Sequence, residues 1–265
     1  MTRPILILGL TRRVGTNFLA RLLTQHSDCA APTALQEDFL VSGLPKLVEY
    51  TGSVSSYWNK DWGAHEKLPQ LRRFLGNGLY QFMQADSQDP SRRTVFKTPA
   101  VAGLEYAPAF LPQCDLVVLT RFGPDVIESG MKGFNWSFEE ACSIWGRAAQ
   151  YVAELLERQR AAGRQTFMIV HYEDLVRDTE TTLRHIFAYV GLRADRFDYA
   201  LIQDFPIYGS SFDRGDQEKL HWSPVPLSTD FKPTERSKCW PDEKLKRFDA
   251  LTRSVSKKLG YELPP

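Results

Sequence analysis

An apolar strand that runs directly into a basic glycine turn and then into a helix constrains this chain more than any other feature. Residues 5–8 are all apolar (ILIL), the turn after them contains Arg12, Arg13 and Gly15, and residues 16–25 have the apolar spacing of a helix. A strand that is apolar at every position is typical of a parallel sheet covered on both faces. The sequence therefore predicts a strand–turn–helix unit of an α/β fold.

Further segments repeat this order along the chain. Short strands are expected around residues 94–96, at 115–119 and at 166–170, with helices at 123–129, 137–162 and 179–190. Residues 32–90 are irregular, helical in pattern and rich in aromatic side chains. We therefore expect one domain over residues 1–265, with a P-loop-like three-layer fold: a central parallel sheet flanked by helices, and residues 32–90 as a helical insertion.

Composition narrows the possible partners. The formal net charge is +1, so the chain has no basic field for a nucleic acid, and an anionic ligand needs a local cluster of Arg and Lys. No apolar run approaches the ~18 residues of a membrane span. The four cysteines (Cys29, Cys114, Cys142 and Cys239) have no metal-binding spacing. We expect no metal, four buried reduced thiols and a cytoplasmic location.

Four polar residues stand where predicted strands end. Arg13, Lys97, Arg121 and Tyr172 each lie at or just after such an end. Ligands of parallel sheets bind beyond the carboxyl ends of the strands, so these side chains should converge.

The first turn has the chemistry of an anion site. Backbone N–H groups and the dipole of the following helix point at one place, and Thr16 and Asn17 add side-chain donors. The planar guanidinium of Arg13 suits phosphate or sulfate. Ser129, eight residues after Arg121, follows by about two helical turns, so this pair predicts a second phosphate site.

A nucleoside triphosphate loop is the obvious alternative. That motif has four residues between its glycines and then a lysine, whereas five residues separate Gly9 from Gly15 and Thr16 stands in place of the lysine. A magnesium site also needs an acidic residue at a neighbouring strand end, where this chain has Thr120 and Arg121. Both differences argue against a kinase.

The ordered combination resembles the sulfotransferases that use 3′-phosphoadenosine 5′-phosphosulfate (PAPS). The turn RVGTN at 13–17 resembles their 5′-phosphosulfate loop, although Val14 and Asn17 depart from the usual residues. VVLTRFGPDVIESG resembles their 3′-phosphate motif, and IVHYEDLVRDTETTLRHIFAYVGL their YEDL segment. The likeness is greatest to the tyrosylprotein and carbohydrate branch, through QHSD at 25–28, FKTP at 96–99 and STDFKP at 228–233.

The resemblance implies transfer of a sulfuryl group from PAPS to an acceptor hydroxyl, and it implies a role for each motif. Arg13 and Lys97 would stabilise the leaving group, Arg121 and Ser129 would hold the 3′-phosphate, and residues 32–90 would lie on the acceptor side. The residues expected to bind PAPS are Arg12, Arg13, Val14, Gly15, Thr16, Asn17, Arg121, Ser129, Tyr172, Ser228 and Lys232, with Lys97 at the sulfuryl group.

The base that accepts the acceptor proton is expected to be Glu37, because the related branch has its catalytic Glu shortly after the first helix. Asp38 and His26 are rivals, although His26 matches a packed structural histidine, and His65 and His221 are more distant candidates. The aromatic residues Tyr57, Trp58, Trp62 and Trp222 either line an acceptor pocket or pack as core or lid.

The acceptor class stays open among a small molecule, a lipid, a glycan and a tyrosyl hydroxyl. Two other functions also stay open: an ATP-dependent small-molecule kinase, and a non-catalytic protein that binds adenosine 3′,5′-bisphosphate.

Overall fold

The centre of the molecule is a five-stranded sheet in which every described pairing is parallel. The computed structural model describes residues 2–206 and 234–262. The strand order is β2-β3-β1-β4-β5, with β1 Ile5–Gly9, β2 Cys29–Ala30, β3 Arg93–Thr98, β4 Asp115–Thr120 and β5 Met168–His171. The predicted α/β class is confirmed, and β2, which the sequence pattern did not reveal, is an additional two-residue edge strand.

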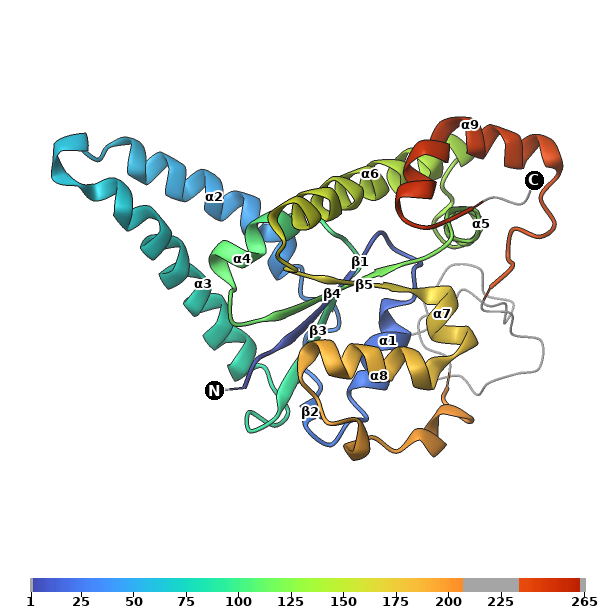
Figure 1. Ribbon diagram of the computed structural model, residues 1–265, viewed down its shortest axis with the longest axis horizontal. Coiled ribbons are helices and arrows are strands. Elements are labelled where there is room, and N and C mark those ends of the chain that lie inside the picture. The colour runs from blue at the N-terminus through green and yellow to red at the C-terminus, as the bar shows by residue number, and fades with distance from the viewer. Residues whose placement is uncertain (1, 207–233, 263–265) are drawn as a thin grey trace.

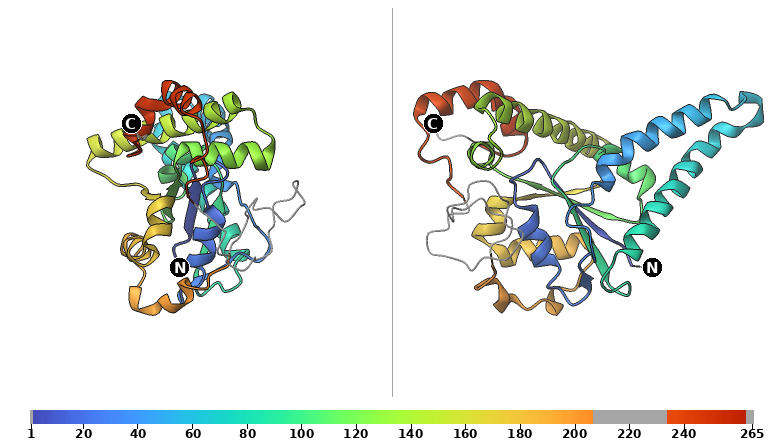
Figure 2. Two further views of the ribbon diagram at one scale, coloured as in Figure 1. Left: turned by 90° about the vertical axis from the view of Figure 1, so that its right-hand side faces the viewer. Right: turned by 180° about the vertical axis from the view of Figure 1, so that it is seen from behind.

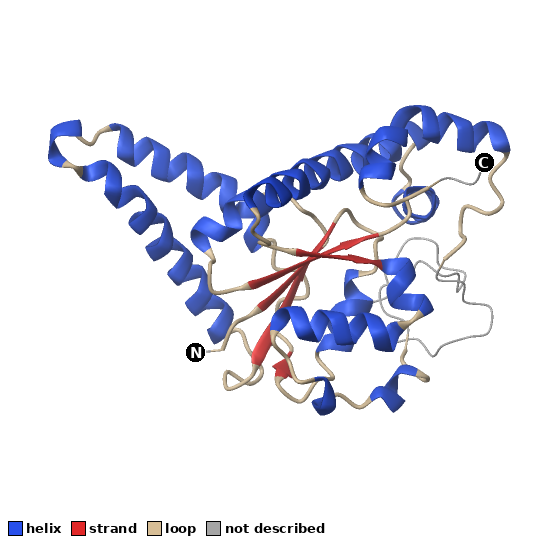
Figure 3. Ribbon diagram, viewed as in Figure 1, coloured by secondary structure: helices blue, strands red, loops and turns tan. Residues whose placement is uncertain are grey.

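Helices cover both faces of this sheet (Figures 1 and 3). The helices on one face are α1 (Thr16–Leu23), α7 (Tyr172–Arg177) and α8 (Thr179–Val190), and those on the other are α5 (Gly123–Phe134), α6 (Phe138–Ala162) and α9 (Asp242–Lys258). All five residues of β1 are buried, as the uninterrupted apolar run predicts. The short helix α4 is Ala107–Phe110, and 3₁₀ turns lie at Lys60–Trp62, Ala64–Glu66, Leu104–Tyr106, Ala194–Arg196 and Tyr199–Ile202.

The segment between β2 and β3 forms a helical hairpin that projects away from the sheet (Figures 1 and 2). Its helices are α2 (Leu40–Ser56) and α3 (Lys67–Ala85). At its tip, Tyr57 is 83% exposed and Trp62 is 69% exposed. Neither ring therefore packs in the core, so the core interpretation made for them from the sequence is wrong.

The end of β1 lies at the topological switch point of the sheet. β1 pairs with β3 on one side and with β4 on the other. β2 and β3 extend the sheet toward one edge, and β4 and β5 extend it toward the other. Doubly wound sheets bind ligands in the crevice beyond such a switch point. The basic turn follows β1 directly, so it lies in this crevice.

Three of the cysteines are buried free thiols, and burial raises the pKa of Cys29, Cys114 and Cys142 to about 12 in each case. Cys239 is free but exposed, because it lies in the turn before α9, so the expectation of four buried thiols is wrong for it. Within residues 2–206 and 234–262, no helix is both long and apolar enough to cross a membrane.

Candidate functional site

The turn after β1 has a backbone conformation that only a few residue types tolerate. Arg13 has a φ of 73° and Gly15 a φ of 99°, both in the left-handed region. A Cβ on Gly15 would lie 2.4 Å from the ring of Tyr172, which begins α7. Glycine is therefore required at position 15 both for its φ and for the close approach of a buried aromatic ring.

The N-terminus of α1 opens from this turn. No side chain caps it at Gly15, so the first backbone N–H groups of the helix can bind an anion. The side chain of Val14 is buried in the core, so only its backbone can face a ligand, whereas the side chain of Asn17 is half-buried. Asn17 and Lys97 line the same small pocket of about 40 Å³.

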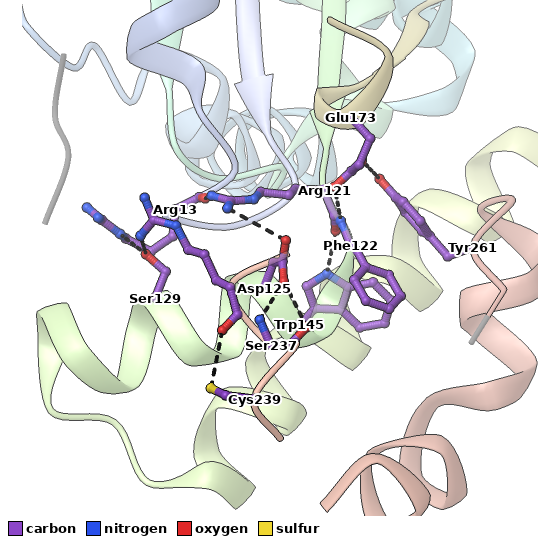
Figure 4. Close-up of polar contacts among 11 residues, drawn as sticks. Arg13, Arg121, Phe122, Asp125, Ser129, Trp145, Glu173, Ser237, Cys239 and Tyr261 are labelled. Carbon is purple, nitrogen blue, oxygen red and sulfur yellow. Dashed lines mark hydrogen bonds and ion pairs between the residues drawn. The ribbon is translucent and has the colours of Figure 1, made fainter. Parts of the chain in front are cut away.

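Arg13 turns toward the second predicted phosphate site. Nε of Arg13 donates a hydrogen bond of 3.0 Å to Oγ of Ser129 in α5. Nη1 of Arg121 donates one of 2.9 Å to the backbone carbonyl oxygen of Arg13 (Figure 4). The guanidinium of Arg121 lies 4.7 Å from the centre of the Tyr172 ring. The structure thus brings together four predicted residues from the ends of β1, β4 and β5 and from α5.

A residue that the sequence analysis missed completes this group. Nη1 of Arg236 donates a hydrogen bond of 3.2 Å to the same Oγ of Ser129. The next residue, Ser237, donates from its backbone N (2.9 Å) and its Oγ (2.8 Å) to Oδ1 of Asp125, whose other carboxylate oxygen lies 3.9 Å from Arg121. Asp125 is buried one helical turn before Ser129, and its partner Ser237 lies more than one hundred residues later, so no local pattern of the sequence predicts the contact.

We call Arg13, Arg121, Arg236 and Ser129 the arginine cluster. Burial, and then the charges of Arg236 and Arg121, lower the pKa of Arg13 from 12.5 to about 10. Burial is also the main cause that lowers the pKa of Arg236, followed by the charge of Arg121. Two guanidinium groups thus donate to one hydroxyl, Arg121 bonds to the backbone of Arg13 beside them, and Asp125 is the buried carboxylate of the group. A bound dianion would relieve this repulsion.

Glu37 and Lys97 form an ion pair next to the turn. Nζ of Lys97 donates to Oε1 of Glu37 at 2.8 Å, and the lysine is 7% exposed. Burial lowers the pKa of Lys97, while the hydrogen bond and charge of Glu37 act in the opposite direction. Lys97 stands beside Ile7 in the β1–β3 register, so both residues of the pair lie near the start of the turn.

The rival bases have other surroundings. Oδ1 of Asp38 accepts a 2.8 Å hydrogen bond from the backbone N of Leu40, and burial raises the pKa of Asp38. Both ring nitrogens of the buried His26 bond to the backbone, Nε2 to Arg193 O at 2.8 Å and Nδ1 to Asp28 N at 3.1 Å. His26 therefore has the packed place expected for it. His221, Trp222, Ser228, Lys232 and the side chain of His65 lie outside the described residues.

A cavity of about 700 Å³ adjoins the turn on the side of α6. Its walls come from the turn (Thr11 and Arg12), from the segment after β3 and from one side of α6, with Trp136 between α5 and α6. The guanidinium of Arg12 lies 5.3 Å from the centre of the Phe134 ring, and that ring stacks on Trp136. The guanidinium of Arg13 lies 5.7 Å from the same ring centre, so both arginines contact Phe134, and of the two Arg12 lines the cavity. Within the described part of the chain, no three His, Cys, Asp or Glu side chains are grouped as a metal site.

Comparisons with known proteins agree on one family. A model of the sulfotransferase family matches residues 4–196. A search of curated proteins gives no match. Among solved structures, the sulfotransferase domain of the Synechococcus PCC 7002 olefin synthase is 17% identical over 100% of this chain and 98% of its own (TM-score 0.54). A sulfotransferase from Alicyclobacillus acidocaldarius is 15% identical over 99% and 98% (TM-score 0.51), and the sulfotransferase domain from the curacin biosynthetic pathway is 15% identical over 100% and 99% (TM-score 0.51). At these identities the structures support the fold, and the family match decides membership: the chain belongs to the sulfotransferase family.

Proposed function

We propose that this protein transfers a sulfuryl group from PAPS to an acceptor hydroxyl. The observation that carries the proposal is the arginine cluster, which brings three arginines together, two of them bonded to Ser129, beside the N-terminus of α1. PAPS has a phosphate at the 3′ position and a phosphosulfate at the 5′ position, so it needs two anion sites. Arg121, Arg236 and Ser129 of the arginine cluster suit the 3′-phosphate, and the turn at the start of α1, to which Arg13 belongs, suits the 5′-phosphosulfate.

The residues around these two sites fit a sulfuryl donor better than a magnesium-bound triphosphate. β4 ends at Thr120 and Arg121 follows it, so a cation stands where a magnesium-binding carboxylate would be needed. Tyr172 lies across both Gly15 and Arg121 and would form an edge of the nucleotide site. The proposed donor is PAPS, and the proposed location is the cytoplasm.

The chemical step needs a base and a stabilised leaving group. The acceptor oxygen attacks sulfur, the bond from sulfur to the bridging oxygen breaks, and that electron pair leaves with adenosine 3′,5′-bisphosphate. Glu37 takes the acceptor proton, which is a role worth about 10²–10⁴-fold in rate. Lys97, whose Nζ donates to Oε1 of Glu37 at 2.8 Å, stabilises the negative charge that develops on the bridging oxygen.

Nucleotide-dependent thermal shifts test the donor. We expect adenosine 3′,5′-bisphosphate to raise the melting temperature far more than AMP, or ATP with Mg²⁺, at equal concentrations, because only the first has a 3′-phosphate for the arginine cluster. Ser129→Ala should reduce this difference, and Ser91→Ala, an exposed serine at the opposite end of the sheet, should not. Equal shifts for the three nucleotides would contradict the proposal, and a larger shift for ATP with Mg²⁺ would favour a kinase.

A further inference from the structure

The cavity beside Arg12 has walls that are largely apolar and aromatic. Ile144 and Tyr151 contribute from α6, Tyr106 from the 3₁₀ turn after β3, and Trp136 from the α5–α6 connection. A volume of about 700 Å³ lies within the range of ordinary small-molecule sites, which is roughly 300–1,000 Å³. Such a cavity fits a compact ligand with a flat apolar body better than a length of peptide or glycan.

The periodicity of α6 explains how this wall arises. Ile144, Arg147, Ala148 and Tyr151 recur at helical spacing on one side of α6, and all four line the cavity. The opposite side of α6 is buried in the core, for example through Trp145. The helix is therefore fixed by its core side and presents Arg147 from a rigid element.

The ionic groups of the cavity are unequally matched. Its carboxylate, Glu105, already pairs with Arg158 at 3.5 Å. Among the described residues, Arg147 has no hydrogen-bond or ion-pair partner for its side chain, and the guanidinium of Arg12 contacts only the ring of Phe134. Two cations that lack carboxylate partners at one largely apolar cavity favour an anionic ligand.

We infer that the acceptor is a small, flat, apolar hydroxyl compound that carries an anionic group, and that Arg147 pairs with that group. This inference rests on the proposed function for the meaning of the word acceptor. Thr11 and Arg12 link the cavity to the turn, since both line the cavity and belong to the turn that leads into α1. An acceptor in the cavity thus lies beside the place proposed for the phosphosulfate, with Arg147 on a different wall.

A matched pair of probes tests the charge preference without turnover. We would measure binding of 6-hydroxy-2-naphthoate and of 6-hydroxy-2-naphthamide by their own fluorescence, with adenosine 3′,5′-bisphosphate present. The two have the same ring system and hydroxyl and differ in charge. Because Arg147 is exposed to solvent, we expect the naphthoate to bind roughly fivefold more tightly. Arg147→Ala should abolish this ratio, and Arg147→Lys should retain part of it.

Two further variants separate the charge from the position. Arg160→Ala removes an exposed arginine from the same helix outside the cavity and should leave the ratio unchanged. Ala148→Phe fills the cavity and should weaken both probes at least tenfold. The inference is wrong if the naphthamide binds as well as the naphthoate, if Arg147→Ala acts no differently from Arg160→Ala, or if Ala148→Phe binds both probes normally.

Nucleotide binding by the same variants tests the proposed function separately. The melting-temperature shift caused by adenosine 3′,5′-bisphosphate without a probe should be the same in wild type, Arg147→Ala and Ala148→Phe, which also shows that the variants fold. A normal nucleotide shift with no charge preference would overturn this inference alone. An absent nucleotide shift together with a normal charge preference would overturn the proposed donor and leave the ligand chemistry of the cavity standing.

Discussion

The conformation of Arg13 decides which site each arginine of the turn serves. Its φ of 73° is uncommon for a residue with a side chain, and such a conformation costs of order 1 kcal/mol or more. In return, its guanidinium reaches Ser129 in α5 and also lies over the ring of Phe134, while Arg12 contacts the same ring and lines the cavity. Strain of this kind persists where the surroundings hold it in place, and here the buried Val14 and the ring over Gly15 do so.

Replacing Arg236 with methionine should separate stability from nucleotide binding. The pKa of Arg236 is lowered, so its charged form is less favourable in the folded protein than in the unfolded chain. Because that cost is present in full at every pH below the lowered pKa, it acts at neutral pH. We expect Arg236→Met to raise the free energy of unfolding of the nucleotide-free protein by about 1 kcal/mol, which raises the melting temperature by a few degrees. Binding of adenosine 3′,5′-bisphosphate should weaken roughly 10- to 100-fold.

Calorimetric titration and thermal melts would measure both quantities. Lys238→Met is the control, because this lysine is exposed two residues away and, within the part of the chain that the structure describes, pairs with Glu235 alone, at 3.2 Å. It should change neither quantity appreciably. A less stable Arg236→Met protein that binds the nucleotide normally would show that the arginine has a structural role instead.

Glu37→Gln and Asp38→Asn should behave differently although the residues are adjacent. Glu37→Gln removes the proposed base, so we expect kcat to fall about 10²–10⁴-fold while the nucleotide thermal shift is kept. Asp38→Asn should keep most of the turnover, because Oδ1 of Asp38 serves the backbone of Leu40 and an amide oxygen can do the same. Normal turnover in Glu37→Gln would mean that another residue is the base. Loss of turnover in Asp38→Asn, with a normal nucleotide thermal shift, would identify Asp38 as the base.

The stability of Asp38→Asn should depend on pH in a definite direction. Burial raises the folded-state pKa of Asp38 above its unfolded value of 3.8, so ionisation of this carboxyl is penalised in the folded protein. The penalty is absent below the unfolded pKa and grows as the pH rises through the folded pKa. The free energy of unfolding that Asp38→Asn gains over wild type should therefore be larger at pH 7 than at pH 3.5, as urea unfolding of both proteins at the two pH values would show. A difference that is the same at both pH values would contradict this assignment.

At the scale of elements, the position of Arg121 depends on contacts from two helices and the C-terminal segment. Oε1 of Glu173 in α7 accepts a 2.8 Å hydrogen bond from the backbone N of Phe122. The hydroxyl of Tyr261, after α9, lies 3.4 Å from Oε2 of Glu173 and 2.8 Å from Oγ1 of Thr120. Trp145 of α6 donates from Nε1 to the carbonyl oxygen of Arg121 at 3.3 Å (Figure 4). Glu173 is therefore a positioning residue for the proposed 3′-phosphate site.

Glu173→Ala should accordingly weaken the nucleotide without altering the chemical step. We expect the KM for PAPS to rise about tenfold, with kcat at saturating PAPS within about twofold of wild type, and Glu173→Gln to recover most of the loss because its amide oxygen can still accept from Phe122 N. Steady-state kinetics at several PAPS concentrations would show this division. A fall in kcat with an unchanged KM would mean that Glu173 acts on the reaction itself.

The main elements were predictable because their signals are local. The apolar runs ending at Gly9 and Thr120, and the helix that ends at Gly191, follow from patterns within ten to twenty residues. β2 has only two residues and exists because Cys29 pairs with Arg93, far along the chain, so no local pattern predicts it. The same holds for Arg236, whose position depends on the buried Asp125 more than one hundred residues earlier.

At the scale of the whole molecule, aromatic residues are divided between the body and the projecting hairpin. The family resemblance implies that the aromatic-rich segment 32–90 lies on the acceptor side, and Pro45 is its one residue that lines the cavity of about 700 Å³. Trp136 and Tyr151, which do line the cavity, lie in segments whose patterns indicated ordinary helix and turn. The pattern of a sequence shows that rings are present, whereas the tertiary packing decides which of them face a cavity.

Variants at the hairpin tip and at Trp136 compare these two groups of rings directly. Tyr57→Ser combined with Trp62→Ser removes two side chains that are mostly exposed at the tip of the hairpin, so little burial is lost. We expect the melting temperature to stay within about 2 °C of wild type, and the affinities for adenosine 3′,5′-bisphosphate and for 6-hydroxy-2-naphthoate to stay unchanged. Trp136→Ala should weaken the naphthoate at least tenfold and leave the nucleotide bound, since Trp136 forms a wall of the cavity and stacks on Phe134. Fluorescence titrations of both proteins decide the matter. A loss of naphthoate binding in the tip variant, with Trp136→Ala unaffected, would place the acceptor on the hairpin and away from the cavity.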